Sequence, residues 1–154
     1  VRVRHQGPER VRRGLLFAAI PLVVGWFLAA ALFHFGHIPS IVALAMAPAG
    51  ALLYGKGAGS RPQAGTVKLV ALLVVGVLLA WPISLATELF LFYTSETGTS
   101  RGALAYVVST MFSTSLFMAK LKELLLVALF GLGGVIAVVQ TIVAANLRRR
   151  SEAS

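Results

Sequence analysis

The chain has 154 residues, of which 58% are hydrophobic and only 12% are charged. Its mean hydropathy of +0.87 lies far outside the range of ordinary water-soluble domains, so the composition predicts one domain within a lipid bilayer. A net charge of +9 would indicate nucleic-acid binding in a soluble protein, but 8 of the 14 basic residues gather at the two ends. That distribution favours anionic lipid as the partner and excludes nucleic acid.

No cysteine is present in this chain, which excludes disulfides, thiolate metal sites and cysteine nucleophiles. Residues 1–13 form a basic arm with five arginines ahead of the first apolar run. Such a segment can belong to a cleaved signal peptide, but the run over residues 14–35 is too long for one and no clean cleavage site follows it. We therefore expect a retained arm, whose arginines either only set the topology or also hold it at an anionic membrane surface.

Membrane spans are predicted from the length of the apolar runs, because a rise of about 1.5 Å per residue makes roughly 20 residues cross a hydrocarbon layer of about 30 Å. Four runs qualify, at residues 14–35, 38–54, 67–93 and 123–146. The first three contain Pro21, Pro48 and Pro82, each of which can kink its helix. The second run is the shortest, and a short span interrupted by proline can mark a binding site in a transporter.

The segment over residues 103–119 is apolar on average but rich in serine and threonine. A helix drawn over it gathers its large apolar side chains on one face: Leu104, Val107, Val108, Met111 and Phe112. Tyr106, Ser109, Thr110 and Ser113 lie on the opposite face. This pattern predicts an amphipathic helix that lies in the membrane interface or re-enters the membrane, with a fifth span as the alternative.

The orientation follows from the distribution of lysine and arginine. With four spans, 11 basic residues fall on one side: Arg2, Arg4, Arg10, Arg12, Arg13, Lys56, Arg61, Lys68, Arg148, Arg149 and Arg150. The other side has three, which are Arg101, Lys120 and Lys122. Because basic residues are enriched on the cytoplasmic side, both termini are predicted there, including a polar tail over residues 147–154. The predicted fold class is therefore an all-α, polytopic membrane bundle of four transmembrane helices plus one interfacial or re-entrant amphipathic helix. The bias towards alanine, valine and arginine favours a bacterial inner membrane.

Small residues recur at intervals of four along three of the spans, and such rows allow membrane helices to approach closely. The second span has Ala43, Ala47, Ala51 and Gly55, the third has Gly76, Ala80 and Ser84, and the fourth has Gly133 and Ala137. We expect these rows to be helix-packing faces of the bundle.

One carboxylate, Glu88, lies inside the third apolar run, in the stretch LATELFLFY. It follows Lys68 by 20 residues, and His34 follows Gly14 by 20 residues, so both side chains are predicted near the outer edge of the hydrocarbon. His37 comes one turn after His34, and Glu96 or Glu123 could join the group. Three interpretations stay open: a proton relay or divalent-metal site, an ion pair between two spans, or ordinary residues of the interface.

The sequence shows no catalytic constellation, since no nucleophile is framed by a hydrolase motif, no aspartate occurs and the carboxylates do not pair in sequence. No cofactor is expected. The favoured function is a transport-related bundle for an ion or small solute, acting as an oligomer because four helices leave little room for a cavity. The alternative is a non-catalytic subunit or scaffold that docks onto a larger membrane complex. A third possibility is a membrane sensor that uses its basic tails.

Overall fold

The computed structural model describes residues 9–36, 40–60 and 62–153, and all regular secondary structure in these ranges is helical. The helices are α1 (Val11–His34), α2 (Ser40–Ala58), α3 (Thr66–Thr97), α4 (Ala103–Met111) and α5 (Thr114–Ala153). α1, α2, α3 and α5 are long and apolar enough to cross a membrane. The predicted all-α bundle with four spans and one short additional helix is confirmed.

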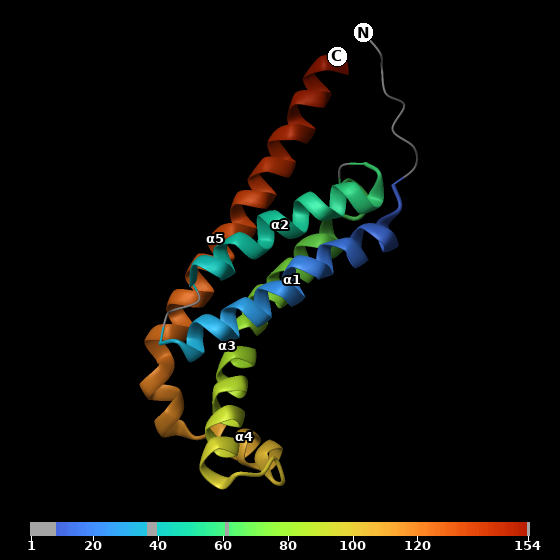
Figure 1. Cartoon of the computed structure of the whole chain (residues 1–154). Coiled ribbons are helices and arrows are strands. Elements are labelled where there is room, and N and C mark those ends of the chain that lie inside the picture. The colour runs from blue at the N-terminus through green and yellow to red at the C-terminus, as the bar shows by residue number, and fades with distance from the viewer. Residues whose placement is uncertain (1–8, 37–39, 61, 154) are drawn as a thin grey trace.

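The four long helices run up and down along the chain (Figure 1). α1 and α2 lie side by side, α3 packs against α1, and α5 packs mainly against α2. The start of α1 and the last turns of α5 lie at one end of the bundle, which we call the terminal end. The opposite end carries α4, and we call it the α4 end.

Each long helix departs somewhat from the apolar run that predicted it. α3 continues to Thr97 and α5 covers 40 residues, because a helix can extend into water beyond the last apolar residue. At a rise of about 1.5 Å per residue, α5 is about 60 Å long and projects well beyond a hydrocarbon layer of about 30 Å. The last residues of α2 and the described residues of the tail are likewise helical and not part of loops.

The segment over residues 103–119 is not one helix. α4 ends at Met111, and residues from Thr114 onward form the first turns of α5. The break falls in a run of serine and threonine, where the Ser113 and Ser115 hydroxyls are 2.8 Å apart; such side chains favour turns and helix ends over helix interiors.

The large apolar side chains of α4 do not all share one environment, as the single apolar face predicted for this segment would require. Ala103 and Val107 pack into the core, whereas Leu104 and Val108 are exposed on an adjacent side of the helix and Phe112, just after its end, is exposed as well. The exposed row is suited to the acyl region of a membrane interface.

The core of the bundle is apolar from end to end, with Leu22, Leu73, Val77 and Val127 almost fully buried. Among the serine, threonine, amide and charged side chains of the described residues, Ser84 alone is fully buried, and its hydroxyl donates to the Ala80 carbonyl at 2.7 Å. The bundle is therefore closed by packed side chains between its two ends.

Small residues bring α1, α2 and α3 close together. Ala43 and Ala47 of α2 and Gly76, Ala80 and Ser84 of α3 are buried, whereas Ala51 and Gly55 are half-buried. A Cβ atom at Gly76 would lie 2.5 Å from a Leu22 methyl carbon, and the Gly76 carbonyl accepts a hydrogen bond from the Trp26 indole at 2.7 Å. The absence of a side chain at Gly76 thus permits both contacts.

The row predicted on α5 does not pack within the chain. Gly133 and Ala137 are exposed, and a Cβ atom at Gly133 would meet nothing within 4 Å. The contact with α2 is made instead by Gly134, where a Cβ atom would lie 2.5 Å from the Leu44 carbonyl oxygen. Gly131 and Gly134 are buried and Gly133 is exposed, so the angle at which α5 meets α2 turns a different face of α5 inwards from the one predicted.

The three prolines lie inside helices that continue through them: Pro21 in α1, Pro48 in α2 and Pro82 in α3. α3 changes direction along its length in Figure 1, and Pro82 is near its midpoint. A proline removes one hydrogen bond and pushes away the preceding turn, which accounts for a bend at this position.

Candidate functional site

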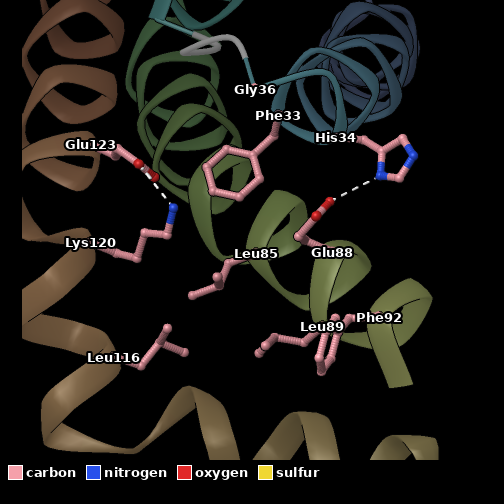
Figure 2. A pocket seen from close by; sticks show the side chains of 10 residues that line it. All are labelled: Phe33, His34, Gly36, Leu85, Glu88, Leu89, Phe92, Leu116, Lys120 and Glu123. Atoms are coloured by element: carbon pink, nitrogen blue, oxygen red, sulfur yellow. Dashed lines mark hydrogen bonds and ion pairs between the residues drawn. The ribbon is translucent and has the colours of Figure 1, made fainter. Parts of the chain in front are cut away.

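A hollow of about 410 Å³ opens at the α4 end between three of the long helices (Figure 2), and we call it the polar cleft. Its lining consists of Phe33, His34, Gly36, Leu85, Glu88, Leu89, Phe92, Leu116, Lys120 and Glu123. α1 contributes its last turn, α3 its second half and α5 its first turns. The ionisable side chains lie on the rim, and leucine and phenylalanine form the walls.

His34 and Glu88 meet across this cleft. The His34 Nδ1 atom lies 3.1 Å from the Glu88 Oε2 atom, and the contact joins the end of α1 to α3 (Figure 2). The side chains are 51% and 39% exposed, so both are open to the cleft and its surroundings. The contact shows that the two residues lie at the same height in the bundle. This agrees with the prediction from their equal separations from Gly14 and Lys68.

Lys120 and Glu123 form a second pair on α5. The Lys120 ammonium lies 2.9 Å from the Glu123 Oε1 atom and 5.0 Å from the centre of the Phe33 ring. The lysine thus connects α5 to α1 through a cation–π contact. The other carboxylate oxygen of Glu123 is buried and has no hydrogen-bond partner in the described part of the chain. Glu123 is predicted from the sequence as a possible member of the site, whereas Lys120 is not, although the i, i+3 spacing of the two residues indicates a pair.

Two other residues named in the sequence analysis do not enter the polar cleft. His37 falls outside the described residues, and Glu96 lies exposed in the last turn of α3, away from the lining. Within the described ranges, no group of three or more histidine, aspartate and glutamate side chains could hold a metal ion. Glu88 and Glu123 instead each have a basic partner of their own.

We expect the pair formed by His34 and Glu88 to couple α1 to α3 in a double-mutant cycle. His34→Ala and Glu88→Gln are each measured alone and together by reversible unfolding in detergent. Because both side chains are about half exposed, the coupling free energy should be about 0.5–1 kcal/mol. As a control, the destabilising effects of His34→Ala and Glu96→Gln should add in the double variant. If the effects of His34→Ala and Glu88→Gln were additive as well, the contact between His34 and Glu88 would not contribute to stability.

A second polar assembly, which the sequence analysis misses, lies at the terminal end. The Glu9 carboxylate accepts hydrogen bonds from the Tyr54 hydroxyl at 2.5 Å and from the Ala64 N–H group at 2.8 Å. The N–H groups of Gln63 and Gly65 approach it at 3.3 Å. These three N–H groups immediately precede α3, so Glu9 binds the positive end of that helix; we call this assembly the Glu9 anchor.

The Glu9 anchor has a defined electrostatic and steric basis. Burial alone would raise the pKa of the Glu9 carboxyl, but the hydrogen bonds from Tyr54 and the three N–H groups outweigh it and hold the pKa below its ordinary value of 4.5. Tyr54 is fully buried, and a Cβ atom at Gly14 would lie 2.8 Å from its ring. Gly65 is equally confined, since a Cβ atom added at this position would overlap the Tyr54 hydroxyl.

Four apolar spans with a closed core, a polar cleft at one end and a carboxylate anchor at the other define a multi-pass helical membrane protein. Comparison with protein families, curated proteins and solved structures finds no match for this chain.

Proposed function

We propose that this protein is transport-related and that its polar cleft receives a proton, an ion or a small charged solute. One observation carries the proposal: four ionisable side chains from three spans, His34, Glu88, Lys120 and Glu123, surround a hollow of about 410 Å³. Ionisable groups within membrane spans are costly, and they commonly mark the route of an ion, a proton or a solute. The hollow is also within the size range of sites for small molecules, about 300–1,000 Å³.

On its inner side the polar cleft borders the apolar core formed by the described residues. Beyond its apolar walls, the interior is filled by buried side chains such as Leu22, Leu73 and Val77. Transport would therefore need either a rearrangement of the helices or a passage between copies, which supports the proposal of an oligomer. The exposed Gly133 and Ala137 offer a smooth surface on α5 for a second copy.

Flux measurements in proteoliposomes test the role of the polar cleft. Glu88→Gln and His34→Ala should each reduce the flux of protons or monovalent cations at least about tenfold, because the first removes a carboxylate from the polar cleft and the second removes the side chain that contacts it. Glu96→Gln is the matched control, since it removes an exposed carboxylate from the same helix outside the cleft. Wild-type flux in both cleft variants would overturn the proposal.

A second candidate function is that of a non-catalytic subunit or scaffold, and the closed apolar core favours it. A subunit needs no passage, and the polar cleft would then receive a side chain of its partner. Purification of the native complex separates the two functions. A stoichiometric membrane partner, together with no flux through the purified chain alone, would favour the subunit.

We also propose that the terminal end faces the cytoplasm of a bacterial cell. The support is the excess of 11 basic residues over three between the two sides of the four spans. The opposite orientation would place the arginine-rich ends outside. Labelling of single cysteines introduced at Gly98 and Ser151 in intact cells would decide, with Gly98 expected to react from outside.

A further inference from the structure

A groove separates α2 from the second half of α5, where the two helices diverge towards the terminal end (Figure 1). It encloses about 460 Å³. Its lining consists of Pro48, Ala51, Leu52, Pro62, Ala137, Val138, Thr141, Ile142, Ala145 and Asn146. We call it the α2–α5 groove. It lies on the opposite half of the bundle from the polar cleft.

The length and the lining of the groove fit an extended apolar chain. Its α5 wall runs from Ala137 to Asn146, which corresponds to about 14 Å along the helix axis. The walls are mostly aliphatic, and alanines on both sides keep the groove open. An acyl chain meets these requirements.

Two cations continue the helix faces that line the groove, one on each helix, beyond the lining itself. Lys56 follows Leu52 by four residues on α2, and Arg148 follows Ala145 by three on α5, so each continues the face that lines the groove. Both side chains are exposed, and neither forms an ion pair with any residue that the structure describes. An apolar groove followed by two exposed cations, neither of them paired with a described side chain, complements a molecule with an acyl chain and an anionic head.

We propose that the α2–α5 groove binds an anionic phospholipid, with an acyl chain between α2 and α5 and the phosphate beside Lys56 and Arg148. The charge complementarity selects this occupant over a zwitterionic lipid or an apolar helix, neither of which would neutralise the two cations. Binding of the lipid would hold the second half of α5 at a fixed distance from α2. Lipid binding here does not depend on transport through the polar cleft.

Native mass spectrometry of the full chain, exchanged into mixed micelles of phosphatidylglycerol and phosphatidylcholine, tests the proposal. Wild-type protein should retain phosphatidylglycerol preferentially, and the double variant Lys56→Gln/Arg148→Gln should lose about tenfold of that preference. Lys68→Gln is the control, because it removes an exposed cation near the same end from a helix that does not line the groove. Equal preference in the wild type and the double variant would overturn the proposal.

A second variant tests the apolar part of the site without changing charge. Ala145→Leu should fill the groove and reduce retention of phosphatidylglycerol, with Lys56 and Arg148 intact. Unchanged retention in Ala145→Leu would place the lipid elsewhere and contradict the proposal. Cysteines introduced at Ala137 or Ala145 that crosslink two copies, with no phosphatidylglycerol retained, would assign the groove to a second copy of the chain instead.

Discussion

Glu9→Ala is expected to lower the free energy of unfolding by about 2–3 kcal/mol, because it removes a charged acceptor from four donors at once. The Tyr54 hydroxyl would be left buried without its partner, and three N–H groups at the start of α3 would lose their anion. Unfolding in mixed detergent micelles measures the loss. Glu96→Gln, which removes an acid with no such contacts, should change stability by less than about 0.5 kcal/mol.

A double variant distinguishes the Glu9 anchor from a general effect of charge in the basic arm. Tyr54→Phe removes the hydroxyl that Glu9→Ala leaves unpaired, so the two substitutions together should cost less than the sum of their separate effects. Additive losses would show that Glu9 does not act through Tyr54.

The stability conferred by Glu9 should also depend on pH. The folded-state pKa of Glu9 lies below its ordinary value of 4.5, so the stabilisation is fully present above pH 4.5 and is lost as the pH falls through the lowered pKa. Glu9→Gln cannot ionise, and its deficit relative to the wild type should therefore shrink below pH 4.5. A deficit that is constant down to pH 2 would contradict the assigned role of the carboxylate.

Sequence patterns predict the spans of this protein well because a single physical quantity, the thickness of the hydrocarbon layer, sets the length of each apolar run. The same reasoning places His34 and Glu88 at one height, since the rise per residue is constant in a helix. Helix ends in water are predicted less well. α3 and α5 continue past the apolar runs that identify them, and hydropathy does not report on helices outside the bilayer.

The Glu9 anchor could not be predicted in this way. Three of its donors are backbone N–H groups 54 to 56 residues away, and backbone donors leave no mark in the sequence. Within an arm of five arginines, a single glutamate is more readily interpreted as a surface residue. Lys120 is not predicted for a different reason: the sequence places it between the segment over residues 103–119 and the span over residues 123–146, whereas in the structure it lies inside α5.

Which glycine of α5 faces α2 likewise depends on how the two helices meet. Gly133 and Gly134 are neighbours in sequence; Gly133 belongs to the row with Ala137, whereas Gly134 lies between Phe130 and Val138 in its own row. Spacing alone identifies a row but not the partner towards which it turns, since that depends on the crossing of α2 and α5. An added side chain is therefore expected to disturb the packing only on the buried face of α5.

Gly134→Leu is therefore expected to lower the free energy of unfolding by about 3 kcal/mol or more, whereas Gly133→Leu should leave the isolated chain unaffected. Even a Cβ atom at position 134 would lie 2.5 Å from the Leu44 carbonyl oxygen, and backbone cannot move aside as a flexible side chain can. At position 133 the same atom meets nothing within 4 Å. Thermal unfolding of the two variants in detergent, at equal concentration, provides the comparison.

The outcome for Gly133→Leu also bears on the proposed oligomer. If a second copy packs on this face of α5, the substitution should dissociate the oligomer in size-exclusion chromatography with light scattering, while a monomeric fraction keeps its stability. Gly134→Leu, by contrast, should destabilise the monomer itself, because its contact with Leu44 lies within one chain. Equal losses of monomer stability at both positions would contradict the observed register of α5 on α2.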